Sequence, residues 1–373
     1  MSAAGNTTAG AETHRARVEA VACLAGIAPW KRARVKRMFR NRHGPVFRNR
    51  AGGAVRAASA RGGAIACWAS RVPEGLEEAA ASAGVPLWWI EDGFLRSSGL
   101  GAALVQPASL TLDSICPYYD PSRASDLEKL LETAEFAPDM LARAAALAAA
   151  IREAALTKYN LGGSPVSLPE GRRIVLVPGQ VEDDRSVLLG SAGVAGMLDL
   201  LARVRAEEPH AFIVYKPHPD VVAGYRQGRL SQDEALRFAD LIAADADLAA
   251  LLARVDAVHV LTSLTGFEAL LRGREVVTHG QPFYAGWGLT ADRAPLPRRT
   301  RRRSLDELVA AALIAYPFYA DPESGVPCSP EQLVRALAAR GQGRPASPLR
   351  AFAGRVAAWQ GGRRNRRARG QEE

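Results

Sequence analysis

The sequence predicts an α/β protein with two Rossmann-like domains, whose parallel sheets face each other across a central cleft. Along most of the 373 residues, apolar runs of strand length alternate with helical stretches, and this rhythm is typical of parallel sheets with helical crossovers. A long alanine-rich helix at 138–160 and the loop at 161–171 interrupt the rhythm once. The interruption divides the chain into two series. Any ligand is expected between them, at the carboxyl ends of the strands.

The first series begins with strand-like runs at 64–70, 86–92 and 109–114. Between the first two runs lies a helical stretch that Gly84 closes, because glycine readily adopts the left-handed conformation found after helix ends. The order strand, helix, strand predicts parallel pairing in this domain.

The second series repeats this order and ends with two helices. Its predicted elements are strands at 173–177, 211–217, 257–263 and 275–280, and helices at about 191–206, 232–253, 266–273, 304–316 and 330–340. The predicted segments are a disordered N-terminus at 1–26, a basic segment at 27–62, an N-terminal domain at 63–165, a C-terminal domain at 170–345 and a basic tail at 346–373.

Positive charge is concentrated near the N-terminus. The formal net charge is +9, and residues 1–61 hold 13 Lys and Arg against two Glu, so the remaining chain is nearly neutral. A basic amphipathic helix is expected within 27–40, where Trp30, Val35 and Phe39 stand among basic residues. A basic, arginine-rich segment can bind nucleic acid, bind anionic lipid, or simply remain solvated. The nearly neutral body argues against a dedicated nucleic-acid-binding protein.

Two other patterns narrow the class of protein. No apolar run reaches the length of a membrane span. The four cysteines are scattered and show no CxxC spacing, which indicates free thiols in a reducing cytoplasm and no structural zinc site.

Polar residues gather in the loops that follow the strands of the second series. The stretch "YKPHPD" places Lys216 and His218 beside two prolines, and "TSLTGFEA" places hydroxyl groups and Gly266 at the start of a helix. Hydroxyls and free backbone N–H groups at a helix start suit a phosphate, while the alternative is an ordinary Ser/Thr cap. Because both loops leave the same edge of one sheet, the phosphate interpretation is favoured.

Two further features have two interpretations each. Glu268 either accepts hydrogen bonds from a ribose or solvates its helix. The loop "GQPFYAGWG" holds Phe283, Tyr284 and Trp287 among glycines, and these rings either stack on a base or a sugar or form a turn with buried aromatic side chains.

A cluster of acids follows a strand in each series. Its members are Glu91 and Asp92 in the first series, and Glu182, Asp183 and Asp184 in the second. Crowded carboxylates raise one another's pKa, so solvation, metal binding and catalysis are the interpretations to weigh. No His or Cys accompanies them at a fixed spacing, and the pair Asp245 and Asp247 falls inside a predicted helix. A metal site among these acids is therefore not favoured.

Six stretches between about residue 63 and about residue 325 resemble, in unbroken order, the capsule polysaccharide KpsC/LipB family: "EDGFLRSSGLGA", "YYDPSRASDLE", "LVPGQVEDDRS", "YKPHPDV", "TSLTGFEALLRG" and "HGQPFYAGWGLTADR". Members are retaining β-Kdo glycosyltransferases of bacterial capsule export, often with two modules in tandem. This sequence shows one module, similar to the C-terminal one. The resemblance implies a GT-B-like architecture, CMP-Kdo as donor of the acidic sugar Kdo, and no metal cofactor. In "SICPYYD", Cys116-Pro117 replaces the usual Gly-Ile.

The resemblance also implies roles for single residues. Asp184 matches the family's nucleophile for a double displacement, and the base for the acceptor hydroxyl is expected at Glu91 or Asp92. Arg96 is expected to bind the substrate carboxylate. The expected nucleotide contacts are Lys216, His218, Pro219, Thr262, Ser263, Thr265, Gly266 and Glu268, and the other expected substrate contacts are Gln180, Arg185, Ser186, Tyr284 and Trp287.

The expected partners follow from that chemistry. They are CMP-Kdo, a lipid-linked acceptor that ends in Kdo, the anionic inner-membrane surface and other capsule assembly and export proteins, without nucleic acid. The protein is expected in the cytoplasm, peripheral at the inner membrane. The alternatives are another GT-B enzyme that uses a UDP-sugar, and a non-catalytic assembly partner.

Overall fold

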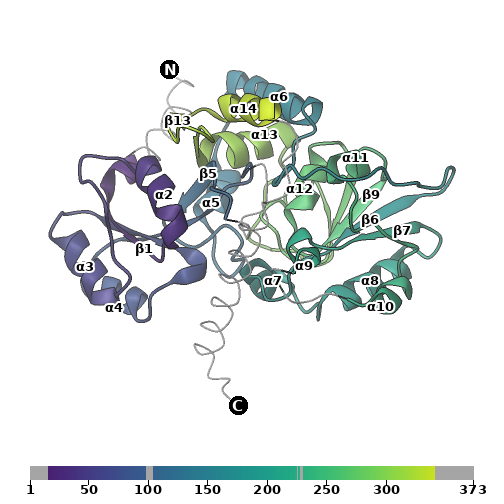
Figure 1. Ribbon diagram of the computed structural model, residues 1–373, viewed down its shortest axis with the longest axis horizontal. Helices are drawn as coiled ribbons and strands as arrows, with labels where there is room; N and C mark the ends of the chain where they lie inside the picture. Colours follow the sequence, from purple (N-terminus) through teal and green to yellow (C-terminus); the bar gives the residue numbers. More distant parts are fainter. Residues whose placement is uncertain (1–15, 98–103, 225, 227–229, 341–373) are drawn as a thin grey trace, which may run out of the picture.

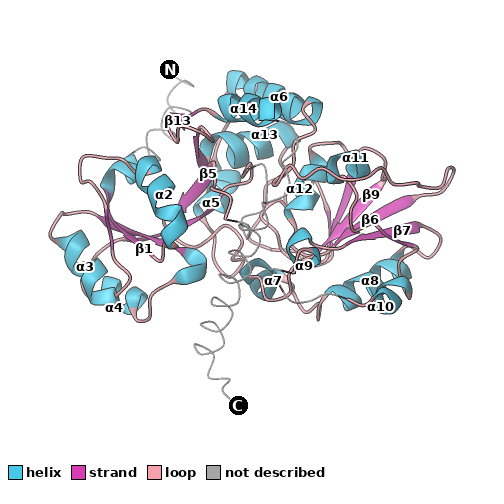
Figure 2. Cartoon of the chain, in the orientation of Figure 1, coloured by secondary structure: helices cyan, strands magenta, loops and turns pink. Residues whose placement is uncertain are grey.

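The computed structural model describes residues 16–97, 104–224, 226 and 230–340. These residues form two sheet domains that lie side by side, with the helices packed around the two sheets (Figures 1 and 2). The predicted α/β class with two Rossmann-like domains is confirmed.

The first domain contains a seven-stranded sheet in the order β13-β12-β5-β4-β3-β1-β2. Its strands are β1 (Val21–Ala25), β2 (Val46–Phe47), β3 (Ala64–Trp68), β4 (Leu87–Asp92), β5 (Ser109–Asp113), β12 (Pro317–Ala320) and β13 (Pro327–Cys328). The strands β1 to β4 pair in parallel, but β5, β12 and β13 run antiparallel to their neighbours. The prediction of an all-parallel sheet is wrong at this edge. The described part of the β4–β5 connection contains no helix, and parallel strands usually need a crossover helix.

The N-terminal boundary also differs from the prediction. Strand β1 lies inside the sheet, between β2 and β3, and all five of its residues are buried. A short run that is apolar on both faces is typical of a strand in a parallel sheet. Residues 21–26 are therefore part of the domain core and do not belong to a disordered N-terminus, while residues 1–15 lie outside the described part of the chain.

The basic segment at 27–62 belongs to the same domain. It forms a short 3₁₀ turn (Pro29–Lys31), α2 (Arg32–Met38), β2 and α3 (Ala51–Ser59). The predicted amphipathic helix exists as α2, but Val35, Met38 and Phe39 pack into the core of the first sheet. The apolar face of this helix is thus covered and does not meet a membrane.

The second domain contains a six-stranded parallel sheet in the order β11-β10-β9-β6-β7-β8. Its strands are β6 (Ile174–Pro178), β7 (Phe212–Lys216), β8 (Leu241–Ile242), β9 (Ala257–Val260), β10 (Glu275–Thr278) and β11 (Ala291–Asp292). The chain moves outward from β6 to β8 and then returns to β9 on the other side of β6. The strand order therefore reverses between β6 and β9, and open α/β sheets bind ligands at the carboxyl ends next to such a reversal.

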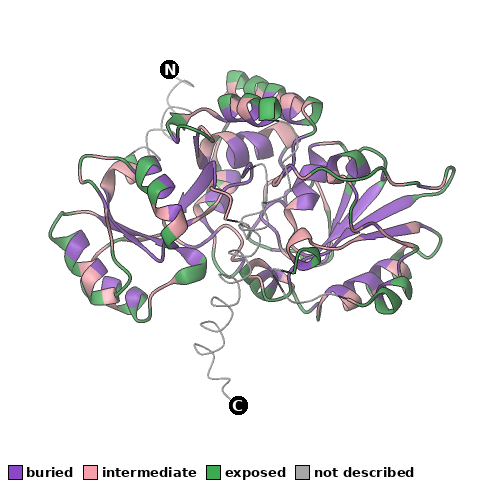
Figure 3. Ribbon diagram, in the orientation of Figure 1, coloured by how far each residue is buried: buried purple, intermediate pink, exposed green. Residues whose placement is uncertain are grey.

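Helices cover both faces of this second sheet (Figure 1). The buried side of α8 (Met197–Glu207) and α10 (Gln232–Leu236) packs on one face, whereas α11 (Leu248–Leu252) and α12 (Leu264–Leu270) pack on the other. The strands between them are buried along their length (Figure 3).

The predicted helix at 232–253 is two helices with β8 between them. Ser231 caps α10, and Asp247 caps α11 by accepting from the backbone N–H of Ala250 at 2.9 Å. Asp245 lies in a turn, so the Asp245 and Asp247 pair is not inside a helix as predicted. Each N-cap side chain satisfies a free N–H group at the start of a helix, which favours two short helices over one long helix.

The chain returns to the first domain near its end. After α13 (Leu305–Val309) and a π-helical turn (Ala310–Ala315), β12 pairs with β5, and α14 (Pro330–Arg340) packs near α6 (Pro138–Glu153). Residues 317–340 thus belong to the first domain, so the predicted boundary at 345 is wrong. The predicted basic tail at 346–373 lies outside the described residues.

One hydrophobic cluster contains residues of both domains. The ring of Phe94, after β4, stacks on Phe283 of the second domain with 4.4 Å between ring centroids. Glu128 on α5 (Asp126–Thr133) forms ion pairs with Arg298 and Arg299. These contacts hold the loop after β4 against the carboxyl ends of the second sheet.

Candidate active site

The candidate site lies where the loop after β4 meets the loops after β6 and β7. Three titratable groups show that these loops are close together. The negative charge of Asp184, after β6, contributes to the pKa shifts of Glu91 at the end of β4 and of His218 after β7. The structure therefore brings together residues from both domains, as the sequence predicts.

The three acids after β6 have separate partners, so they do not form one crowded cluster. Glu182 accepts from the backbone N–H of Met197 at 3.0 Å and caps α8. Asp183 forms an ion pair with Arg226 at 2.8 Å. Of the three, Asp184 is the acid whose charge acts on the groups of the first domain.

Asp184 is the N-cap of α7 (Arg185–Gly190). Its Oδ1 accepts from the backbone N–H of Ser186 at 3.0 Å and from the Ser186 hydroxyl at 2.8 Å. No hydrogen bond to Oδ2 occurs within the described residues. Ser186 thus fixes the orientation of the carboxylate and leaves one oxygen for a substrate, with the exposed Arg185 next to it.

Glu91 has the protonation behaviour of a general base. Burial and then the charge of Asp92 raise the pKa of Glu91 to about 7. Its Oε2 accepts from the Tyr119 hydroxyl at 3.3 Å, and its Oε1 accepts from the backbone N–H of Asp92 at 3.0 Å. A carboxylate whose pKa lies near neutral pH takes up and releases protons efficiently.

Asp92 and Arg96 hold each other and are not available to a substrate. Arg96 is 1% exposed and donates to Asp92 at 2.8 Å, to Ser97 and to the carbonyl of Val105. Burial opposes the ionisation of Asp92, but Arg96 and Lys31 outweigh it and keep the pKa of Asp92 below its usual range. The expectations that Asp92 is a base and that Arg96 binds the substrate carboxylate are therefore wrong.

Lys31 was not predicted as a site residue. Its ammonium lies 3.3 Å from Asp92 and 3.4 Å from the centroid of the Trp68 ring, and burial lowers its pKa to about 8. The basic composition of its segment concealed this role, since the sequence does not show that β1 brings Lys31 next to β4.

His218 is a neutral hydrogen-bond donor. As the N-cap of α9 (Pro219–Val222), it accepts from the backbone N–H of Asp220 through Nδ1 at 3.1 Å. Burial and the nearby Lys158 lower its pKa to about 4. The neutral ring therefore carries its proton on Nε2. Pro219 supplies no N–H group and acts by starting the helix.

Lys216, unlike His218, uses its side-chain donor group in a hydrogen bond within the protein. Its ammonium donates to the carbonyl of Ala244 at 3.2 Å, and burial lowers its pKa. Lys216 is therefore held by the loop after β8 and is a weaker candidate for a phosphate contact than its place in the sequence suggests.

The backbone of the predicted phosphate cradle is already satisfied. Gln180 accepts from the backbone N–H groups of Thr262 at 3.0 Å and Ser263 at 3.1 Å, and donates to the Thr262 hydroxyl at 2.9 Å. Ser263 in turn caps Thr265. Gln180 is thus a positioning residue, and Ser263 is the N-cap of α12, so these backbone N–H groups do not await a phosphate. The hydroxyl protons of Thr262 and Ser263 remain as donors.

Gly266 is required for protein packing. A Cβ atom at this position would lie 2.3 Å from the Tyr284 hydroxyl oxygen, and that hydroxyl donates to the carbonyl of Ser263. Tyr284 and Trp287 are fully buried, and Trp287 donates to the carbonyl of Phe283 at 2.9 Å. The predicted stacking of these rings on a base or a sugar is wrong, because they form the core of a turn.

Glu268 binds the segment that joins the two domains. It is 5% exposed and accepts from the backbone N–H of Lys158 at 2.6 Å, while burial raises its pKa. Thr265 also bonds its carboxyl group. The predicted ribose contact is therefore replaced by a structural role.

Lys158 is a second site residue that sequence reasoning missed. Burial disfavours its cation, but the hydroxyl groups of Tyr159 and Tyr118, followed by the carboxylates of Asp92 and Asp184, outweigh burial and raise the pKa of Lys158 above its usual value. No salt bridge within 4.0 Å is formed by Lys158 in the described part of the chain. It therefore supplies positive charge to the site that no single carboxylate neutralises. A lysine after an alanine-rich helix has no motif that would signal this role.

The comparisons with known proteins agree with this architecture. Residues 63–161 and 160–320 match the model of the family described as capsule polysaccharide biosynthesis protein. The chain belongs to the capsule polysaccharide biosynthesis protein family. Capsule polysaccharide modification protein LipA of Neisseria meningitidis serogroup A is 48% identical over 241 residues, which cover 64% of this chain and 34% of LipA. The chain therefore spans about a third of the length of that relative.

Other similar proteins match over more of their length. Lipopolysaccharide-processing protein LpsZ of Rhizobium meliloti is 40% identical over 330 residues, which cover 86% of this chain and 75% of LpsZ. Two structures of Thermosulfurimonas dismutans KpsC are similar. The β-Kdo 2,7 transferase has a TM-score of 0.70 at 34% identity and covers 86% of this chain and 99% of its own. The β-Kdo 2,4 transferase has a TM-score of 0.74 at 30% identity, and the match covers 87% of this chain and 100% of its own. The architecture is GT-B-like, as predicted.

Proposed function

We propose that the protein is a retaining glycosyltransferase that moves Kdo from CMP-Kdo to a lipid-linked, Kdo-terminated acceptor in capsule polysaccharide biosynthesis. One observation carries the proposal: Asp184 has an oriented carboxylate whose second oxygen receives no hydrogen bond from the described residues, and Glu91, whose pKa is about 7, lies within range of its charge. A nucleophile and a base from opposite domains suit a double displacement. The similarity to two KpsC Kdo transferases supports the sugar.

In the first step, an oxygen of Asp184 attacks the anomeric carbon of Kdo. The bond from that carbon to the phosphate oxygen breaks, and CMP leaves with the electron pair. The departing phosphate needs hydrogen-bond donors more than it needs an acid. His218 Nε2–H and the hydroxyls of Thr262 and Ser263 donate no hydrogen bond to another described residue and can stabilise its charge.

In the second step, Glu91 takes the proton of the acceptor hydroxyl while that oxygen displaces Asp184 from the anomeric carbon. The two inversions together retain the configuration. Glu91 suits this step because its carboxylate form is populated near neutral pH and because Tyr119 orients it.

Lys158 is proposed to bind the carboxylate of Kdo. Kdo is an acidic sugar, and Arg96, which was expected in this role, is buried against Asp92. The ammonium group of Lys158 has no carboxylate within 4.0 Å among the described residues and lies close enough to Asp184 for the two charges to interact. It is therefore the cation best placed to meet an anionic substrate at the nucleophile.

A cytoplasmic location at the inner-membrane surface, beside other capsule assembly and export proteins, is also part of the proposal. Within the described residues, no helix is both long and apolar enough to cross a bilayer. The exposed Lys36 and Arg40 remain available to anionic lipid. Leu188 and Leu189 on α7, next to Asp184, are 48% and 41% exposed and suit a lipid-linked acceptor.

The experiment that tests the function is intact-protein mass spectrometry of the chain mixed with fresh CMP-Kdo, beside Asp184→Asn and the control Asp183→Asn. A mass gain of one Kdo is expected for the wild type and for Asp183→Asn, and not for Asp184→Asn. If no variant gains mass and no CMP is released with a Kdo-terminated acceptor, the donor is wrong. Thermal stabilisation by UDP and not by CMP would then identify a UDP-sugar enzyme.

A further inference from the structure

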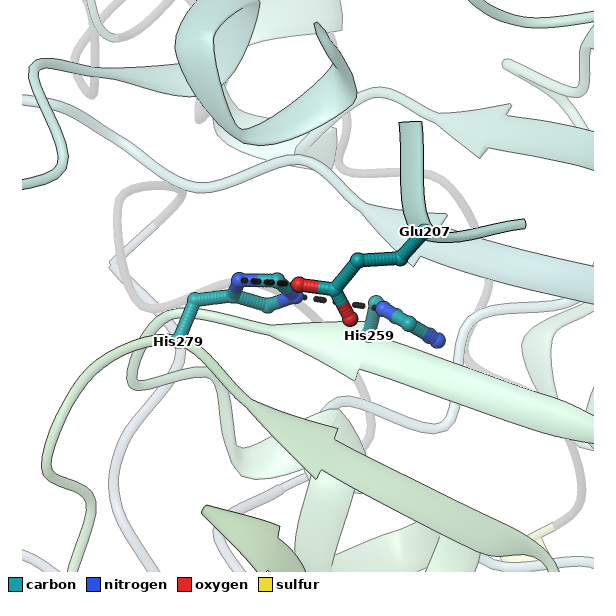
Figure 4. Close-up of side chains that lie close together, drawn as sticks. All are labelled: Glu207, His259 and His279. Carbon is teal, nitrogen blue, oxygen red and sulfur yellow. Dashed lines mark hydrogen bonds and ion pairs between the residues drawn. The ribbon is translucent and has the colours of Figure 1, made fainter. Parts of the chain in front are cut away.

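Two histidines and one glutamate come together in the second domain, outside the site described above. His259 lies on β9, His279 follows β10, and Glu207 ends α8 (Figure 4). Each offers one metal-ligand atom, and these atoms all lie within 4.8 Å of one another. Among the described residues, no other group of three such side chains meets this spacing.

The two imidazole rings already have the spacing of a shared metal ion. Nδ1 of His259 lies 3.1 Å from Nε2 of His279. Two nitrogens that bind one tetrahedral zinc ion at about 2.0–2.1 Å lie roughly 3.3 Å apart. A hydrogen bond between the rings gives a similar distance, so the partners of the outer ring nitrogens distinguish the two arrangements.

The surroundings of the outer nitrogen of His259 are compatible with metal binding. This Nε2 is buried and has no hydrogen-bond partner among the described residues, and Glu208 lies 3.8 Å away. A histidine that binds a metal commonly directs its second N–H to a carboxylate, and Glu208 is placed for that role.

We propose that Nδ1 of His259, Nε2 of His279 and the carboxylate of Glu207 bind a divalent transition metal of the zinc class, with water as the remaining ligand. Two imidazoles and one carboxylate are a ligand set that such ions prefer. Figure 4 shows the Glu207 carboxylate over the gap between the two rings. Its side chain is 32% exposed, so the ion has a route from solvent.

The local charges are compatible with this ion. Glu207 and Glu208 place two carboxylates near the two rings. Glu207 forms an ion pair with Arg293 at 2.8 Å, and its side chain has to turn from Arg293 to reach the metal fully. We therefore expect an affinity that rises when this arginine is removed.

The metal would have a structural role. It would join β9, β10 and α8, which are distant in sequence. Met197, at the other end of α8, donates to Glu182 beside Asp184. Glu207 lies ten residues further along this helix, which is about 15 Å of helix length. The ion would therefore not reach a substrate at Asp184, and glycosyl transfer should persist after the metal is removed.

The test is a titration of the full chain with Co²⁺ after dialysis against EDTA, followed by visible absorption and repeated with Zn²⁺ by competition. One equivalent of Co²⁺ should give d–d bands of a tetrahedral site, without the near-ultraviolet band of thiolate ligands. His279→Asn should abolish saturable binding. Glu207→Gln, at a partly exposed position that tolerates change, should weaken it by at least about tenfold. His210→Asn is the matched control, because His210 is exposed near the end of the same helix.

Three results would overturn the proposal. They are the absence of saturable binding in the wild type, wild-type binding by a folded His279→Asn or Glu207→Gln variant, and a thiolate band that assigns the metal to cysteine. The same samples, tested for Kdo transfer with EDTA present, keep this proposal separate from the proposed function, since each can fail while the other holds.

Discussion

Gln180 and Thr262 bind each other through both ends of the glutamine amide. Gln180 Nε2 donates to the Thr262 hydroxyl at 2.9 Å, and its Oε1 accepts from the Thr262 backbone N–H at 3.0 Å. The contact joins the carboxyl ends of β6 and β9, where the strand order reverses. A site at such a reversal needs a fixed spacing between the two strand ends, and one buried amide provides it here.

Replacing Gln180 with Leu should therefore damage both stability and activity. The change leaves the backbone N–H groups of Thr262 and Ser263 without their acceptor, which costs about 1–3 kcal/mol per buried group. We expect a lower midpoint in urea unfolding and a lower kcat. Gln281→Leu is the control, since its side chain makes one long contact of 3.4 Å. Equal stability of the two variants would show that Gln180 has no positioning role.

Glu91→Gln should separate the two chemical steps. Because Asp184 is intact, the variant should gain the mass of Kdo, but it should release little product to an acceptor. In the wild type the base must be ionised, so kcat/KM should rise with pH and level off above about 7, the pKa of Glu91. Glu78→Gln, on the exposed face of α4 (Leu76–Ser82), is the control. An unchanged pH profile in Glu91→Gln would exclude this base.

Glu91 should also reduce the stability of the folded protein at alkaline pH. Its pKa is raised from 4.5 to about 7 on folding, so the folded state binds more protons between these values and stability falls as pH rises through this range. Above pH 7, Glu91→Gln should be more stable than the wild type by up to about 3 kcal/mol. At pH 4 the difference should vanish. Urea unfolding of both proteins above pH 7 and at pH 4 measures the difference in their free energy of unfolding. An equal difference at the two pH values would contradict the prediction.

Arg96→Met should destabilise the fold strongly, because it leaves Asp92 with Lys31 as its remaining cation. Loss of one partner from a buried pair costs about 3–5 kcal/mol. Arg143→Met is the matched control, since Arg143 is exposed and pairs with Glu331 at the surface, where an ion pair contributes less than about 1 kcal/mol. A stable Arg96→Met variant with a raised KM for the donor would instead restore Arg96 as a substrate ligand.

Lys158→Met should weaken the binding of the Kdo group and spare the nucleotide. A hydrogen bond to a charged group contributes about 1.5–3 kcal/mol, so KM for CMP-Kdo should rise by roughly 10- to 100-fold. CMP lacks the Kdo carboxylate, and its thermal stabilisation of the variant should equal that of the wild type. Lys129→Met, on the exposed side of α5, is the control. An equal loss of CMP and CMP-Kdo binding would place Lys158 at the phosphate.

Membrane binding by the basic N-terminal segment can be tested with substitutions of exposed residues. A deletion of residues 1–50 would remove β1 and β2 from the sheet, so surface substitutions are needed. Lys36→Glu with Arg40→Glu should reduce pelleting with anionic liposomes, because each basic residue near such a surface contributes about 1 kcal/mol. Leu188→Ser with Leu189→Ser should reduce it further, and Val326→Ser, exposed on the connection before β13, should not. Unchanged pelleting in the first two variants would remove the proposed surface.

The sequence by itself determined the α/β class, the two domains and most strand positions, because short apolar runs and helix periodicity are local properties. Its motifs also determined the family and selected Asp184, Glu91 and His218. Only the tertiary structure decided which polar side chains already have their hydrogen-bond partners within the protein. Gln180, Arg96, Glu268, Tyr284 and Trp287 occur in the same motifs, yet their hydrogen bonds are made within the protein. Lys31 and Lys158 lie outside those motifs and reach the site through long-range packing. The physical reason is that hydrogen-bond partners distant in sequence decide whether a buried polar group is satisfied, and the pairing of β1 and β12 with β3 and β5 depends equally on contacts that no local pattern records.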